Sequence, residues 1–105
     1  GRIILKNMPY TYCLEYVADT LAASYTYDKN NFSGQAVYDY FMARVENYCM
    51  TKATKEFISW VLLTYANEGF KGLKKKITKQ KYLEITSKYP EVEEYKINLK
   101  EEYHE

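Results

Sequence analysis

At residues 57–65 the chain reads FISWVLLTY, which is its longest nearly unbroken apolar run. The run has about nine residues, whereas a membrane-spanning helix needs about twenty. Phe57, Val61 and Tyr65 recur at helical spacing, and Trp60 and Leu63 make most of the remaining circumference apolar as well. We therefore expect a buried central helix at this point and no membrane span.

Signals for helix starts lie on the N-terminal side of this run. Pro9 suits the beginning of a helix over about residues 9–26. Ser33 is a good N-cap for a second helix, because Phe32 before it and Val37 after it have the spacing of a hydrophobic staple. The residues from Thr51 to Thr54 offer hydroxyl caps where the central helix would begin.

Signals for helix ends lie on the C-terminal side. Gly69 suits the left-handed position after the central helix, and it would place Phe70 beside Tyr65. Thr78 is a candidate cap for a further short helix, and Pro90 stops it.

The fold class follows from these elements and from the composition. The chain has 105 residues, 47% of them hydrophobic, and only four glycines. Strand-like alternation never persists and hairpin dipeptides are absent. We expect one all-α domain over residues 1–105, an antiparallel four-helix bundle, with residues 1–8 as an N-terminal extension and residues 91–105 as an acidic C-terminal helix or tail.

Positive charge is concentrated in one segment of a chain whose net charge is only +1. Residues 71–81 contain six lysines and no acid. On a helix that begins near Phe70, Leu73 and Ile77 would face the core while the lysines fan over the outer surface. A localised positive field of this kind attracts polyanions. The lysines are Lys71, Lys74, Lys75, Lys76, Lys79 and Lys81.

These six lysines are the candidate nucleic-acid-binding residues, and Arg44 would extend them if the corner after the second helix lies alongside. Arg2 and Arg44 are the only arginines, so contact with the phosphate backbone is favoured over the reading of bases. A helix-turn-helix is disfavoured, because residues 70–88 lack a clear turn. The alternative is a solvated helix face whose lysines pair with the acidic residues from Glu84 onward.

Residues suited to catalysis or metal binding are scarce. The one histidine, His104, lies in a polar stretch, and glycine-rich phosphate loops are absent. Cys13 and Cys49 lack the spacing of a metal or redox motif, so we expect buried thiols, with a disulfide between them as the alternative. We therefore expect no enzyme, no cofactor, no metal site and no small-molecule substrate.

Part of the chain resembles the major coat proteins of the rudivirus and lipothrixvirus families, which are filamentous viruses of archaea. The match covers roughly residues 33–90 and consists of helix lengths and residue classes. The matching segments are the turn Asn31-Phe32-Ser33-Gly34 followed by Ala36-Val37-Tyr38, the helix opening Ala53-Thr54, its end Tyr65-Ala66-Asn67-Glu68-Gly69, and the segment Tyr82-Leu83-Glu84-Ile85.

The resemblance implies a four-helix bundle whose subunits pair, coat double-stranded DNA and build a nucleocapsid. On this hypothesis the partners are DNA phosphates and a second or paralogous coat subunit, and the location is the virion; otherwise we expect a cytoplasmic protein. The competing hypothesis is a small helical interaction module of a phage or plasmid that docks onto a host protein. Thirteen tyrosines would suit such a docking face, although tyrosine could equally serve as an ordinary core residue here.

Overall fold

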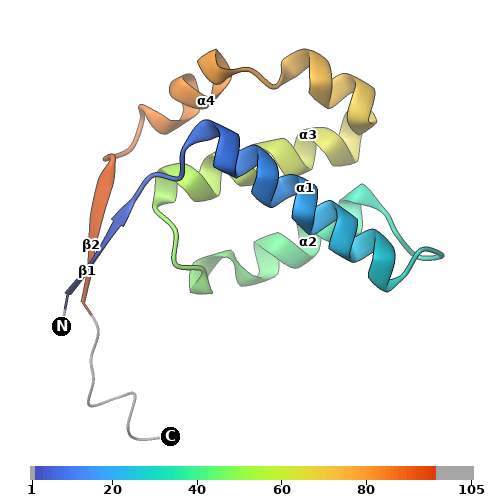
Figure 1. Ribbon diagram of the computed structural model, residues 1–105, viewed down its shortest axis with the longest axis horizontal. Helices are drawn as coiled ribbons and strands as arrows, with labels where there is room; N and C mark the ends of the chain where they lie inside the picture. The colour runs from blue at the N-terminus through green and yellow to red at the C-terminus, as the bar shows by residue number, and fades with distance from the viewer. Residues whose placement is uncertain (1, 97–105) are drawn as a thin grey trace, which may run out of the picture.

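The molecule consists of a helical body from which a two-stranded sheet extends (Figure 1). The computed structural model describes residues 2–96. The predominantly helical content is confirmed, whereas the sheet was not expected. The elements in chain order are β1 (Arg2–Lys6), α1 (Tyr10–Tyr27), α2 (Gly34–Arg44), the 3-10 turn η1 (Val45–Asn47), α3 (Lys52–Lys76), α4 (Lys79–Thr86) and β2 (Val92–Lys96).

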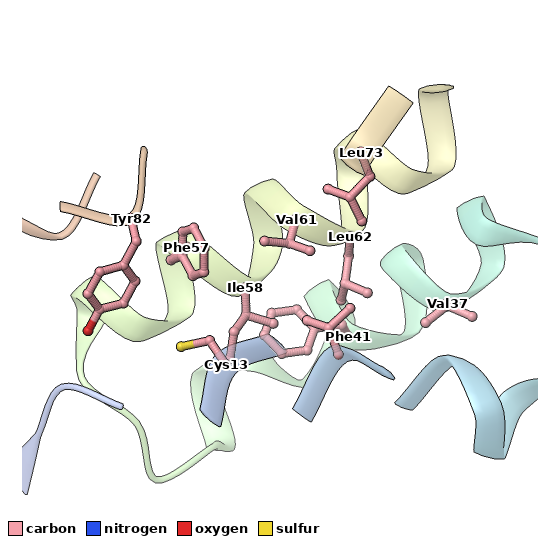
Figure 2. Packing of buried hydrophobic residues seen from close by; sticks show 10 residues of the cluster. Cys13, Val37, Phe41, Phe57, Ile58, Val61, Leu62, Leu73 and Tyr82 are labelled. Atoms are coloured by element: carbon pink, nitrogen blue, oxygen red, sulfur yellow. The ribbon is translucent and has the colours of Figure 1, made fainter. Parts of the chain in front are cut away.

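The central helix is α3, against which α1, α2 and α4 all pack. Its residues Phe57, Ile58 and Val61 are fully buried. Figure 2 shows these side chains meeting Cys13 of α1 and Phe41 of α2 in one cluster. Each large apolar side chain buried in this way stabilises the fold by about 1.5–3 kcal/mol. The prediction of a buried central helix is therefore confirmed.

Three helices begin at hydroxyl caps, as the sequence predicted. The side-chain oxygens of Ser33, Thr51 and Thr78 each accept a hydrogen bond from the backbone N–H three residues later, at 3.0, 3.2 and 3.0 Å. Each cap satisfies a donor that the first turn of a helix leaves free, and contributes about 1 kcal/mol.

Gly69 divides α3 into two helical segments, residues 52–68 and 70–76. Its φ of 71° is positive, as predicted, but its ψ of −173° is extended rather than left-handed helical. Only glycine adopts this combination readily. The chain reverses here, so the second segment and α4 run back along the first segment (Figure 1). Phe70, just after the bend, is 68% exposed.

The sheet corrects two expectations about the ends of the chain. Residues 2–6 are a strand rather than an extension, and residues 92–96 are a strand rather than a helix or tail. The two strands pair antiparallel, with Ile4 opposite Glu94. Each segment is too short to show alternation by itself, and its partner is about ninety residues away, so the chain carries no local hairpin signal. The rest of the predicted tail, residues 97–105, lies outside the described residues.

A small polar network fastens the end of β1 to the beginning of α3. The Thr51 hydroxyl donates to Asn7 Oδ1 at 2.6 Å, and Met8 N–H donates to Thr54 Oγ1 at 3.0 Å. The two threonine hydroxyls are 2.9 Å apart and both residues are buried. Hydrogen bonds among buried groups are costly to leave unmade, so this network fixes where the strand leaves the body.

Both cysteines are free thiols, so the disulfide considered from the sequence is wrong. Cys13 is fully buried, as predicted, but Cys49 is exposed. The predicted apolar stripe assumed that a regular α-helix continues to Cys49. The helix α2 ends at Arg44 instead, and Cys49 follows the 3-10 turn η1.

Candidate nucleic-acid interface

The predicted lysines lie on both sides of the turn between α3 and α4. Four belong to the second segment of α3 and two to the first turn of α4. Leu73 is buried and Ile77 is half-buried, which confirms that these two residues face the core. Ile77 N–H donates to Leu73 O at 2.8 Å and so closes the helix. The segment is thereby held by its apolar side while its lysines face solvent.

Lys71, Lys74 and Lys75 share one side of the helix, which we call the lysine face. At 3.6 residues per turn, positions i, i+3 and i+4 lie within about 100° of each other around the axis. Leu73 lies on the other side, towards the core. All three lysines are exposed, and Lys79 at the beginning of α4 is exposed as well. The exposure that the sequence predicted is therefore seen at these four lysines and at Lys76.

Two of the six lysines already have acidic partners. Lys76 Nζ lies 2.6 Å from Glu68 Oε2, and this ion pair spans the bend at Gly69. Lys81 Nζ lies 3.3 Å from Glu84 Oε1 and 5.5 Å from the centre of the Trp60 ring. Within residues 2–96, the other four lysines have no carboxylate within salt-bridge distance.

The described acids of the C-terminal segment are engaged elsewhere. The Glu93 carboxylate accepts a hydrogen bond from the backbone N–H of Lys52, at the beginning of α3. Glu94 Oε1 lies 3.0 Å from Arg2 Nε, across the sheet. Between residues 84 and 96, only Glu84 pairs with one of the six lysines. Among the described acids, the alternative in which the acidic segment covers the lysines is therefore met only at Lys81.

The helix dipole favours the positive charge of some of these lysines and disfavours that of others. Lys74, Lys75 and Lys76 lie in the last turn of α3, where positive charge is favourable by a few tenths of a kcal/mol each. Lys79 and Lys81 lie in the first turn of α4, which has no acid. Positive charge is unfavourable there. The dipole of α4 thus adds to the positive potential of the turn rather than offsetting it.

Arg44 does not extend the lysine face. Its guanidinium carbon lies 3.6 Å from the centre of the Tyr40 ring, and its Nη1 donates to Tyr40 O at 3.4 Å. In Figure 1 the end of α2 lies below the first segment of α3, and the lysine-bearing segment lies above it. The structure therefore separates this predicted site residue from the others.

A groove between α1 and α2 is a second surface feature, which sequence reasoning did not locate. Its volume is about 770 Å³, and Tyr27 and Tyr40 on its walls are 93% and 60% exposed. The high tyrosine count was the one available signal, but helical spacing does not say which rings remain accessible. The aromatic residues that line the groove are Tyr16, Tyr27, Phe32, Tyr40, Phe41 and Tyr48.

The described residues offer little reactive chemistry. No group of three or more metal-ligating side chains occurs among residues 2–96. Burial raises the pKa of the Cys13 thiol to about 12, so the thiol is protonated at neutral pH. Its Sγ donates to Met8 O at 3.5 Å. In the described part of the chain, no helix has both the length and the apolar character that crossing a membrane requires.

Comparisons of the chain with protein-family models, with curated proteins and with solved structures found no match. The resemblance to filamentous-virus coat proteins therefore rests on the sequence pattern alone.

Proposed function

We propose that this protein is a non-enzymatic structural protein that coats double-stranded DNA by binding its phosphate backbone. The observation that carries the proposal is the lysine face of Lys71, Lys74 and Lys75, exposed and without acidic partners among residues 2–96. Lys79, at the beginning of α4, is a fourth exposed lysine without an acidic partner among the same residues. The chain as a whole is nearly neutral, so this local field acts without general repulsion between subunits.

Binding of this kind works by releasing the cations condensed on DNA. Each phosphate neutralised by a lysine lowers the slope of log K against log salt by about 0.9. The four free lysines alone would give a slope of about −3.6, and about six contacts would give a slope near −5. Lysine is a point charge on a flexible stem, so it suits phosphates in any sequence rather than one base pattern.

The wider role follows from the sequence resemblance. On this proposal α1 to α4 form the antiparallel four-helix bundle of a coat subunit. The subunits would associate with each other, or with a paralogous subunit, around DNA in a virion. The α3–α4 turn supports this role, because it lies along an outer edge of the helical body (Figure 1) and its lysines are exposed except for the half-buried Lys81.

The test compares two triple variants with equal charge changes. One replaces the lysine face with Gln at Lys71, Lys74 and Lys75. The matched control replaces the exposed Lys29, Lys52 and Lys88 with Gln. Retardation of two unrelated duplexes is measured over a series of salt concentrations. We expect similar affinity for both duplexes, and a salt slope that becomes shallower by about 2.7 in the first variant only. Equal effects in the two variants, or no retardation of wild type at low salt, would contradict the proposal.

The groove between α1 and α2 favours the second candidate function, a small interaction module of a phage or plasmid. Exposed tyrosines around an apolar groove resemble the centres of protein interfaces. On this hypothesis the wild-type protein binds a host protein, and this binding is lost when Tyr27 and Tyr40 are replaced by Ala. Binding is retained when Tyr12, which is exposed on α1 outside the groove, is replaced by Ala. It is also retained by the lysine-face variant, which separates this function from DNA binding.

A further inference from the structure

The small sheet is the least covered part of the molecule. Within residues 2–96 it has only two strands, so each strand has an outer edge without a strand partner. Ile3, Ile4 and Val92 are 40%, 63% and 48% exposed. A lone pair of strands is marginally stable in water, and further strands or a packed face are needed for stability. The two edges and these exposed apolar side chains therefore leave room for further strands.

The backbone groups on the outer edge of β1 can be identified from the pairing. Asn7 N–H donates to Glu91 O at 3.0 Å, which marks a hydrogen-bonded pair. Such pairs alternate along an antiparallel ladder, so Leu5 and Ile3 also direct their backbone groups towards β2. The N–H and C=O of Ile4 consequently point away from β2, as do those of the residues two positions before and after it. β1 thus presents free donors and acceptors with Ile4 at their centre.

The same register shows which side chains flank this edge. The ion pair between Arg2 and Glu94 places both on the face of the sheet that carries Ile4 and Val92. Glu93 belongs to the opposite face, where its carboxylate reaches the beginning of α3. The face of Ile4 is therefore directed away from that contact with the body.

A second copy of the chain fits the β1 edge through a two-fold axis. Antiparallel pairing of two β1 strands about Ile4 sets the two exposed isoleucines opposite each other. It also puts the helical bodies at opposite ends of the sheet, because each body joins β1 at Lys6. The cost is Arg2 facing Lys6 of the second copy. This like-charge pair occurs twice, and it is offset in part because each Arg2 is already paired with Glu94 of its own copy.

The other ways of extending the sheet are less favourable. Two-fold pairing through β2 would set Glu94 opposite its own copy, so it would have a like-charge pair at its centre where β1 pairing has two isoleucines. An open stack of copies would repeat every two strands, about 9.6 Å. The molecule measures 17 Å along its shortest axis, so successive bodies would be crowded. Crowding thus disfavours the stack, and the charge at its centre disfavours the β2 edge.

We propose that the outer edge of β1 is a self-association surface, through which two copies form a four-stranded antiparallel sheet in the order β2-β1-β1-β2. The main-chain hydrogen bonds of Ile4 and its neighbours provide the pairing, and contact between the two exposed Ile4 side chains adds apolar burial. This pairing deepens the subunit association of the proposed coat function and rests on it in that respect, but nucleic acid takes no part in it, so it can be tested separately from DNA binding.

The test uses proline as a probe of each edge. Ile4→Pro removes an N–H that points outward and leaves the bonds between β1 and β2 in place. Val92→Pro is the matched control, because residue 92 lies opposite residue 6 and its N–H points out of the β2 edge. Sedimentation without nucleic acid, up to millimolar protein, should show a concentration-dependent dimer for wild type and Val92→Pro. Ile4→Pro should be monomeric, with unchanged helical circular dichroism.

A second variant keeps the test decisive if proline disturbs the strand. Ile4→Lys retains the backbone N–H but sets two ammonium groups face to face at the two-fold axis, and we expect the dimer to weaken ten-fold or more, which corresponds to about 1.4 kcal/mol. A monomeric wild type, or a dimer that survives both Ile4 variants, would overturn the proposal. DNA retardation by a monomeric Ile4 variant would show that the two functions are separate.

Discussion

The hydroxyl of Tyr82 donates a hydrogen bond of 2.6 Å to the backbone oxygen of Met8, 74 residues earlier in the chain. The Tyr82 ring meets the Phe57 ring edge-on, with 5.0 Å between the ring centres. Burial raises the pKa of this hydroxyl, so it remains a protonated donor. Because Met8 joins β1 to α1, this one side chain fastens α4 both to the core and to the base of the sheet.

Replacing Tyr82 separates these two contributions. Tyr82→Phe keeps the ring but loses the hydrogen bond, and we expect the free energy of unfolding to fall by about 1 kcal/mol. Tyr82→Ala also empties the space between α3 and α4, and should cost about 3–5 kcal/mol. Urea unfolding followed by circular dichroism measures both. If Tyr82→Phe were as stable as wild type, the bond to Met8 would not contribute to stability.

The Thr51 hydroxyl caps α3 and also donates to Asn7 in the polar network at the end of β1. Its removal should therefore lower the free energy of unfolding more than removal of an ordinary cap would. Thr51→Val should lower the unfolding free energy by about 1–3 kcal/mol, because it removes the cap of α3 and leaves Asn7 Oδ1 without its donor. Thr51→Ser keeps the hydroxyl and is the matched control. We expect thermal unfolding to distinguish the two variants clearly; equal losses would mean that the methyl group, not the hydroxyl, matters here.

Gly69→Ala tests the bend that carries the lysine face. No atom lies within 4 Å of an added Cβ, so the cost comes from the backbone conformation alone. We expect a loss of about 1–3 kcal/mol in unfolding free energy. Asn67→Ala, an exposed helical position two residues earlier, should be nearly neutral. Chemical denaturation compares the pair, and an equally neutral Gly69→Ala would show that the bend is unstrained for other residues.

The buried Cys13 thiol predicts a loss of stability at alkaline pH. Its pKa is about 12 in the folded protein and 9.0 when unperturbed, so the unfolded state loses its proton first as pH rises. The stabilising effect is complete below pH 9.0 and declines towards pH 12, by about 1.4 kcal/mol for each pH unit. Cys13→Ala should remove this part of the decline. The unfolding free energies of wild type and Cys13→Ala at pH 8 and pH 10 measure this difference. An equal decline in both proteins would show that the Cys13 thiol does not cause the loss of stability.

The features predicted correctly are those that depend on local sequence. The caps at Ser33, Thr51 and Thr78 need only a hydroxyl placed three residues before a free N–H. The bend at Gly69 needs only a residue that tolerates a positive φ. The exposure of Lys71, Lys74 and Lys75 follows from helical spacing once Leu73 is assigned to the core. Each of these can be judged within one or two turns of a helix.

The features that sequence reasoning missed depend on how distant segments meet. Ile3 and Ile4 gave no strand signal, because the strand that pairs with them lies at the other end of the chain. The sequence placed Arg44 beside the lysines only on the condition that the end of α2 lies near them. Whether it does depends on the side of α3 against which α2 packs. The groove with Tyr27 and Tyr40 exists because α1 and α2 diverge, which no pattern within either helix records.

The way β1 meets β2 also determines how the molecule would respond to mechanical force. Arg2 and Lys96 are paired at the open end of the ladder, so a pull applied to these two residues loads its hydrogen bonds one after another instead of all together. The strands would unzip at low force before any tension reached α3. The molecule would thus carry two short tethers that lengthen under strain while the helical body remains intact.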